Sequence, residues 1–240
     1  MNYLSWKNYF ESNRNHFANI DWDQTANLSA GELSSIRSSI QQFQKGEQSE
    51  GKHLFSFAKS FPDPYYLDTM RLFILEEQTH ARILGRFMDK EGIPRIKHHW
   101  VDGTFRWLRK LAGLENTITV LVTAEIIAKV YYKALGSCTN SELLQQICRQ
   151  ILKDEDQHIA FQAYTLHIFY REKRSFARLF SRNWHRLLMA VTILVVWLHH
   201  RKVLQAGGYY FLSFFFETFQ VYFDMEKQVR TIPGLQPAWL

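Results

Sequence analysis

Apolar residues recur at alternating intervals of three and four along most of the chain, which is the spacing of one face of an α-helix. A Ser-x-x-Glu capping pattern at Ser29 opens the first such face, which continues to Phe61. Two prolines follow, and a residue that precedes proline disfavours the helical conformation. Asp63 suits the N-cap and Pro64 the first turn of a second helix, which the pattern extends to Gly92.

Two more helices are predicted in the middle of the chain, after a connector at residues 95–115. The first of them covers about residues 116–135 and ends at a glycine. A second capping pattern, at Thr139 and Glu142, opens another helix that reaches about Tyr170. A connector of this length lets the chain cross from one antiparallel helix pair to the other.

Two further helical stretches follow a basic segment, at about residues 181–206 and 208–229. The first 28 residues show no clear period, and we interpret them as an arm that packs against the body. No alternating run of apolar and polar residues is long enough to predict a strand. The sequence therefore predicts an all-α fold.

The pattern Glu-x-x-His occurs twice, at Glu77–His80 and Glu155–His158, and each copy lies in the apolar face of a predicted helix. Residues three apart share a helix face, so each copy presents a carboxylate beside an imidazole. Burying a carboxylate is costly unless a cation or hydrogen bonds compensate its charge. Two such faces that meet would form the two halves of a dinuclear site, and carboxylate and imidazole ligands suit iron or manganese.

Each of the other two core helices carries a glutamate at a matching place in its apolar face. Glu47 precedes Glu77 by 30 residues, and Glu125 precedes Glu155 by the same number. In an antiparallel helix pair joined by a short turn, such residues reach similar heights. The chain therefore reads as two related helix pairs, each of which contributes Glu…Glu-x-x-His.

The ligand on the first helix has two candidates. Glu50 lies one turn beyond Glu47 on the same stripe, and its small neighbours Ser49 and Gly51 suit a crowded site. Glu47 matches the 30-residue offset, and we favour it. Glu50 is retained as an alternative or additional ligand.

An acidic residue directly precedes each motif glutamate, Glu76 before Glu77 and Asp154 before Glu155. Metal-bound histidines usually donate their second ring nitrogen to a carboxylate or a carbonyl group. Glu76 and Asp154 are therefore predicted to orient the two histidines.

The alternative to a metal is a helical bundle whose buried carboxylates pair with cations such as Lys129 or Arg82. Tyr131 and Tyr132 are expected in the core, where either hydroxyl could donate to a ligand carboxylate.

The length of 240 residues and the apolar content of 46% suffice for one large domain, which we place over residues 1–240. Its metal-binding four-helix core is expected at about residues 29–170 and a C-terminal helical extension at about residues 181–229. The net charge of +6 is scattered and lacks a recognition motif, so no nucleic-acid partner is predicted.

Two cysteines, Cys138 and Cys148, supply no disulfide framework, and no signal-peptide pattern opens the chain. A cytoplasmic location is therefore expected. The longest apolar run, residues 187–198, is shorter than the roughly 20 residues that span a bilayer. It predicts a buried helix or a contact with a membrane surface, and no transmembrane segment.

The six favoured ligands resemble the set found in the ferritin-like di-iron carboxylate proteins, in which two helices give one Glu each and two others give Glu-x-x-His. The strings at residues 76–80 and 154–158 resemble those of bacterial multicomponent monooxygenases, the ribonucleotide reductase small subunit and soluble acyl carrier protein desaturases. The resemblance covers about residues 30–170 and is specific to the superfamily. Leu84 stands seven residues after Glu77, where the reductase subunit carries its radical tyrosine.

This resemblance implies a ferritin-like four-helix bundle with two iron ions, or with manganese or a mixed pair in their place. Glu77 or Glu155 would bridge the metals, each histidine would bind one, and Glu47 and Glu125 would be terminal ligands. The implied function is an oxidoreductase that activates O₂ to oxidise an apolar or carrier-bound organic substrate. An external electron donor is then required, and a homodimer is compatible with the pattern.

Two other functions are kept as alternatives. One is a metal-binding or iron-handling protein without an organic substrate. The other is a degenerate helical scaffold that binds no metal.

Overall fold

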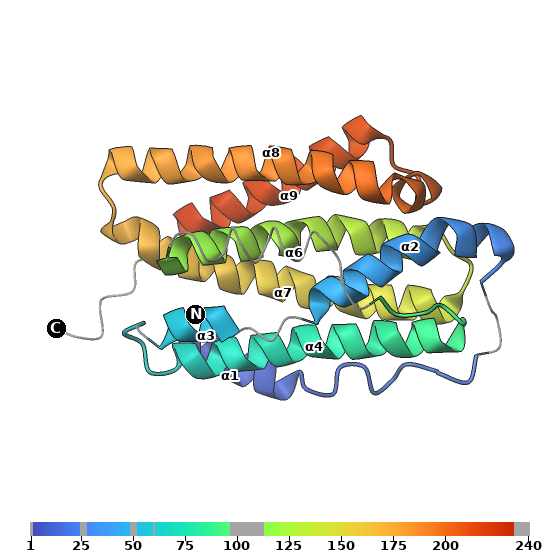
Figure 1. Ribbon diagram of the computed structural model, residues 1–240. Coiled ribbons are helices and arrows are strands. Elements are labelled where there is room, and N and C mark those ends of the chain that lie inside the picture. The colour runs from blue at the N-terminus through green and yellow to red at the C-terminus, as the bar shows by residue number, and fades with distance from the viewer. Residues whose placement is uncertain (1, 25–27, 49–51, 60, 97–112, 233–240) are drawn as a thin grey trace.

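The computed structural model describes residues 2–24, 28–48, 52–59, 61–96 and 113–232, and Figure 1 shows their arrangement. Within these ranges the chain forms eight α-helices and no strand, which confirms the all-α prediction. The helices are α1 (Tyr3–Ser12), α2 (Ala30–Glu47), α3 (Lys52–Ala58), α4 (Tyr66–Lys90), α6 (Gly113–Ser137), α7 (Glu142–Glu172), α8 (Ser175–Ala206) and α9 (Phe211–Thr231).

The long helices lie side by side around a common apolar interior. Helices α6 and α7 form the most extensively packed pair, α2 packs on α4, and α4 packs on α7. Helix α8 packs against α2 and α6, and α9 packs against α6, α7 and α8. In Figure 1, α8 runs along one edge of the molecule and α4 and α1 lie toward the opposite edge. The interior of the protein is thus enclosed between these two edges.

The first 28 residues contain a helix that the sequence analysis missed. Helix α1 begins where Asn2 accepts a hydrogen bond from the backbone N–H of Ser5 at 2.8 Å. Tyr3, Trp6 and Phe10 are buried, and their spacing of three and four is a helical period. The expectation that this segment packs against the body is confirmed, because α1 lies on α4.

The predicted first helix, from Ser29 to Phe61, is wrong as a single element. Its capping box at Ser29 is present, but α2 ends at Glu47 and α3 begins at Lys52. At the end of α2 the N–H of Gln48 bonds to the carbonyl of Lys45, three residues back, which tightens the last turn. The apolar period continues across this break, so periodicity alone could not reveal it.

The second predicted helix is present, with small differences at its ends. Helix α4 begins at Tyr66 instead of Pro64, although Asp63 still accepts from the N–H of Tyr65 at 2.8 Å. It ends at Lys90, and Gly92 has a φ of 65°, which favours glycine. The predicted connector falls mostly at residues 97–112, outside the described part of the chain.

The predicted boundaries of the later helices also need correction. Helix α6 begins three residues earlier and ends two residues later than predicted. The N-cap of α7 is Ser141, whose hydroxyl accepts from the N–H of Leu144, and not Thr139. Thr139 instead accepts from the N–H of Ser141. The N-cap of this helix was therefore predicted two residues too early, at Thr139 instead of Ser141.

Helix α8 starts six residues before its predicted beginning, so most of the basic segment at residues 171–182 is helical. Of the helices described, α8 is long and apolar enough to cross a bilayer by length and composition, and 44% of its most apolar window is buried against the protein. The helix ends where a side chain at Gly207 would lie 2.4 Å from the carbonyl oxygen of Ala134. Glycine thus permits the close approach of α8 to α6.

Candidate metal centre

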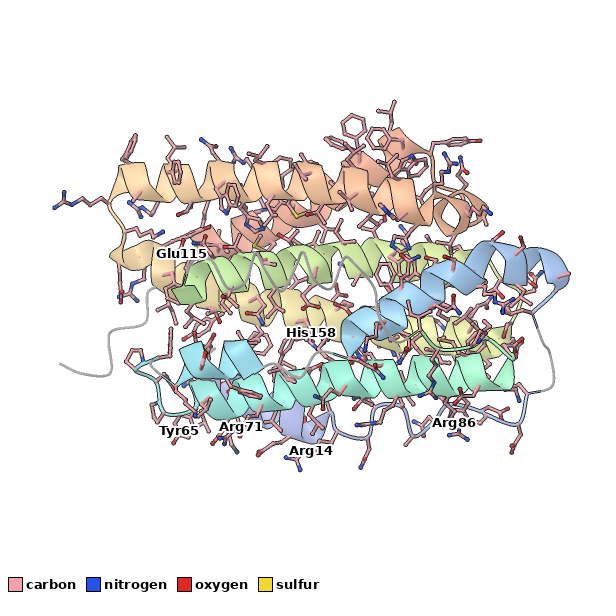
Figure 2. All side chains as sticks on the ribbon, viewed as in Figure 1. Arg14, Tyr65, Arg71, Arg86, Glu115 and His158 are labelled. Atoms are coloured by element: carbon pink, nitrogen blue, oxygen red, sulfur yellow. The ribbon has the colours of Figure 1, made fainter. Side chains whose placement is uncertain are left out.

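Acidic and histidine side chains from four helices meet inside the protein. Glu47 is the last residue of α2, Glu125 lies on α6, and α4 and α7 each supply one Glu-x-x-His pair. Figure 2 shows the labelled His158 in the middle of the helical body, whereas the labelled arginines lie along its outer edge. The most exposed of the six side chains is that of Glu77, at 14%. The cluster is therefore largely removed from solvent.

The potential ligand atoms of these six side chains form two overlapping groups, each within 4.8 Å, and His80 also belongs to a third group with His16 and Asp154. One group contains Glu47, Glu77 and His80. The other contains Glu77, Glu125, Glu155 and His158. Because Glu77 belongs to both, it occupies the place of a carboxylate shared between two cations. Glu155 also reaches toward both groups, since its Oε1 lies 3.8 Å from Nδ1 of His80.

Both histidines turn Nδ1 toward these carboxylates. Nδ1 of His80 lies 3.6 Å from Oε1 of Glu77. Nδ1 of His158 lies 2.9 Å from the same oxygen, 3.6 Å from Oε2 of Glu125 and 3.7 Å from Oε2 of Glu155. The Nδ1 atoms of both imidazoles therefore lie near the same carboxylate oxygen, Oε1 of Glu77.

Five of these buried atoms have no hydrogen-bond partner among the described residues. They are Oε1 of Glu77, both carboxylate oxygens of Glu155, and Nδ1 of His80 and of His158. Buried polar groups in proteins are nearly always paired, and each unpaired one costs about 1–3 kcal/mol. Their chemistry, carboxylate oxygen and imidazole nitrogen, is that of iron or manganese ligands. The residues present therefore fit a pair of divalent cations.

The alternative cations do not reach the cluster. Lys129 forms an ion pair with Asp156 at 2.5 Å near the surface, and Arg82 donates to the hydroxyl of Thr79. In the described part of the chain, every ion pair recorded for the six side chains joins a carboxylate to a histidine. Among the described residues, salt bridges to lysine or arginine therefore do not account for the buried carboxylates.

The outer nitrogens of the histidines bond to the two preceding acids in a crossed pattern. Nε2 of His80, on α4, donates to Oδ2 of Asp154, on α7, at 3.1 Å. Nε2 of His158, on α7, donates to Oε2 of Glu76, on α4, at 2.8 Å. The sequence predicted that these acids orient the histidines, and this contact is present. It did not reveal that each acid serves the histidine of the opposite helix.

Two residues of the N-terminal segment contact Glu76 and Asp154 from behind, and sequence reasoning missed both. The side-chain amide of Asn13 donates to Glu76 at 2.6 Å and to Asp154 at 3.1 Å. The ring of His16 lies 3.4 Å from Glu76 and 3.3 Å from Asp154. Asn13 is the C-cap of α1, so the end of that helix sets its position. The only signal in the sequence was the unrecognised apolar face of α1.

Burial dominates the electrostatics of the cluster. It raises the pKa of Glu155 well above its usual range, and the charge of Glu125 raises it further. Burial and the neighbouring charge of Glu77 likewise raise the pKa of Glu47. For His158, burial alone would lower the pKa, but the charge of Glu77 and the other carboxylates around the ring, Glu76 among them, outweigh it. The folded protein without metal thus retains protons that a metal ion must displace.

For His80, burial also acts to lower the pKa, but the hydrogen bond to Asp154 and the charge of Glu77 raise it overall. Burial acts to raise the pKa of Asp154, but the hydrogen bond from His80 lowers it overall. The two shifts describe one charged hydrogen-bonded pair behind the cluster.

Glu47 has a partner of its own, because the hydroxyl of Tyr132 donates to its Oε1 at 2.6 Å. Tyr131 and Tyr132 are both buried, as expected, and Tyr132 makes the contact with a clustered carboxylate that the sequence left open. Glu50, the other candidate on the first helix, lies outside the described residues. Its role stays a prediction.

Aromatic rings surround the two histidines. Phe73 packs edge-on against His158 with ring centroids 4.8 Å apart, and Phe10 of α1 lies 6.0 Å from the same ring. Phe17 lies 5.8 Å from His80. These rings exclude water from one side of the cluster, which strengthens electrostatic interactions within it.

Comparison of the chain with protein-family models, with curated proteins and with solved structures found no match. The site is therefore argued from its own geometry.

The crossed contacts predict which substitution affects which ion. Asp154→Asn should weaken binding at His80 about 10–100-fold, because a carboxylate behind a ligating histidine raises its basicity and fixes its orientation. Glu76→Gln should weaken binding at His158 to a similar extent. We would measure both by titrating metal-free protein with Co²⁺, a spectroscopic substitute for Fe²⁺.

A double-variant cycle distinguishes crossed from same-helix support. Asp154→Asn should add little to the loss caused by His80→Ala, yet it should add its full effect to His158→Ala. The reverse result would mean that each acid supports the histidine of its own helix.

Proposed function

We propose that the protein is a ferritin-like dinuclear iron protein that activates O₂. In this proposal α2, α4, α6 and α7 form the four-helix bundle and the six clustered side chains are the ligands. The observation that carries it is the set of five buried potential ligand atoms without a hydrogen-bond partner, which gather around Glu77 and have only carboxylates and imidazoles as charged neighbours among the described residues. No lysine or arginine of the described chain compensates them.

The position of each clustered side chain suggests its role toward the two proposed metal ions. Glu77 would bridge the two ions, and Glu155 lies near enough to both groups to act as a second bridge. His80 and Glu47 would hold one ion, and His158 and Glu125 the other. Asp154 and Glu76 would keep Nε2 of each histidine protonated and so leave Nδ1 free to bind.

A bound pair of ferrous ions would supply electrons to O₂ and so drive oxidation of an organic substrate. The residues around the site would limit water there, because Phe10, Phe17 and Phe73 pack against the histidines. We propose an apolar or carrier-bound substrate and an external electron donor. Manganese or a mixed pair would use the same ligands.

The test is the stoichiometry of iron and its reaction with O₂. Metal-free protein titrated with Fe²⁺ under nitrogen should bind two ions per chain. Admission of air should then oxidise both ions and consume O₂, as followed by a colorimetric assay for ferrous iron and an oxygen electrode. Binding of fewer than two ions, or ferrous iron that persists in air, would contradict the proposal.

The same experiment separates oxidation catalysis from iron handling. Repeated additions of Fe²⁺ should leave iron at two per chain, because the ligand set holds only two ions. Continued uptake into a shell-like assembly, seen by light scattering, would favour iron storage.

A further inference from the structure

The outer face of α8 is apolar along most of its length. Between residues 184 and 198, the five residues that are exposed as a whole are all apolar: Trp184, Leu187, Val191, Leu194 and Leu198, at 40–58%. The side chain of Arg186, at the edge of this face, is also 40% exposed and pairs with Glu226 of α9. Toward the start of the helix, Phe176 is 82% exposed, Leu179 55% and Phe180 69%. A soluble helix normally exposes polar residues on this face.

These residues form one continuous stripe. Leu187, Val191, Leu194 and Leu198 lie within an arc of about 60° at 3.6 residues per turn. From Phe176 to Leu198 the stripe is about 33 Å long at 1.5 Å per residue. In Figure 1, α8 lies along the outer edge of the molecule, and the start of α9 stands beyond it near the C-terminal end of α8.

The charges around the stripe are positive. Helix α8 contains no Asp or Glu, and the exposed pair Arg201 and Lys202 follows directly after the stripe. Between α8 and α9, a hollow of about 230 Å³ is lined by Arg186, Phe223, Glu226, Lys227 and Arg230. Its three cations and one carboxylate leave two positive charges uncompensated. An apolar stripe bordered by cations complements a layer of anionic headgroups above acyl chains.

Neither self-association through α8 nor insertion across a bilayer fits these observations as well. In a pair of α8 helices, parallel or antiparallel, basic ends would face basic ends, and the helix offers no acidic residue to compensate them. Insertion would require the inner face to leave the core. That face carries the fully buried Met189 and Ile193, and His185 bonds to Thr123 of α6 at 3.1 Å.

We propose that the protein docks on anionic lipid membranes through the outer face of α8. The helix lies parallel to the membrane plane, its apolar stripe enters the boundary between headgroups and acyl chains, and Arg201 and Lys202 contact lipid phosphates. The docking holds with or without metal in the carboxylate–histidine cluster.

The test is sedimentation of the full chain with lipid vesicles. Vesicles of equal parts phosphatidylglycerol and phosphatidylcholine should bind the protein about 30-fold more tightly than phosphatidylcholine alone, as expected for two cations near an anionic surface. The triple variant Leu187→Gln/Val191→Gln/Leu194→Gln should bind at least about tenfold more weakly. Arg201→Gln/Lys202→Gln should reduce the preference for anionic lipid at least about tenfold, and the cations of the hollow between α8 and α9 account for what is left.

Matched controls come from the opposite edge of the molecule. Leu4→Gln/Leu75→Gln replaces leucines that are 38% and 42% exposed on α1 and α4, and should bind like the unaltered protein. Arg14→Gln/Arg71→Gln removes two cations that Figure 2 shows at that edge, and should leave the lipid preference intact. Thermal unfolding of each variant checks that it is folded.

Three results would overturn the proposal. They are failure of the unaltered protein to bind anionic vesicles, equal binding by the folded triple variant, and a vesicle-free dimer that the triple variant converts to a monomer. The last result, measured by sedimentation velocity, would assign the stripe to a second copy of the chain.

Discussion

Glu77→Ala is expected to abolish binding of both metal ions. The carboxylate of Glu77 belongs to both groups of ligand atoms, and Nδ1 of His158 lies only 2.9 Å from its Oε1. Glu47→Ala removes a ligand from one group only and should leave one ion bound. Elemental analysis after loading with Fe²⁺ should therefore give about zero and about one iron per chain.

An exposed glutamate provides the matched control. Glu172→Ala alters the end of α7, far along the helix from Glu155, and should retain two ions per chain. If Glu77→Ala retained two ions while remaining folded, Glu77 would not be the shared ligand and the proposed arrangement would fail.

Glu155→Gln is expected to change stability in opposite directions with and without metal. Glu155 is fully buried, and both its oxygens lack hydrogen-bond partners. Without metal, the buried carboxyl of Glu155 must either hold a proton or bear a charge near Glu125, and both cost free energy at neutral pH. A neutral amide avoids this cost and should raise the free energy of unfolding by about 1–3 kcal/mol. With metal, the variant lacks an anionic ligand and should lose about 3 kcal/mol of the stabilisation from an ion at 100 times its dissociation constant.

The stability difference between Glu155→Gln and the unaltered protein, both without metal, should depend on pH. Burial raises the pKa of Glu155 in the folded state, so the unaltered protein loses stability as pH rises from the ordinary glutamate pKa toward the folded value. Glutamine carries no charge at any pH in this window, so the advantage of the variant should grow as pH rises. Urea unfolding at several pH values, with and without Fe²⁺, measures both effects.

An exposed residue of the same helix again serves for comparison. Glu142→Gln lies in the first turn of α7 and should shift stability by less than about 0.5 kcal/mol whether or not metal is present. A variant at residue 155 that destabilised the metal-free protein would show that its carboxylate is stabilised by contacts other than metal.

The helices and the clustered side chains were predictable because both depend on local spacing. A helix brings residues three apart onto one face, so Glu77–His80 and Glu155–His158 could be read directly. The offset of 30 residues then related Glu47 and Glu125 to these motifs, and the structure places all six side chains together. Whether they bind metal is the proposal that the iron titration tests.

The ends of the helices were less predictable from the sequence than the faces that the helices bury. The apolar period runs without interruption through the end of α2 and into α3, because a break changes backbone direction without changing which residues are apolar. Helix α1 was missed because only three buried aromatic residues mark its inner face among polar neighbours. The misplaced cap at Thr139 arose because two hydroxyl residues, 139 and 141, compete for one helix end.

The sequence by itself determined the helical class, the two Glu-x-x-His motifs and the pair of matching glutamates, since each follows from residue spacing along a helix. Only the tertiary structure decided that Asp154 and Glu76 support the histidines of opposite helices, and that Asn13 and His16 bridge those acids. It likewise decided which face of α8 stays exposed. The physical reason is that such contacts join residues far apart in the chain, so they depend on how the helices pack and leave no period in the sequence.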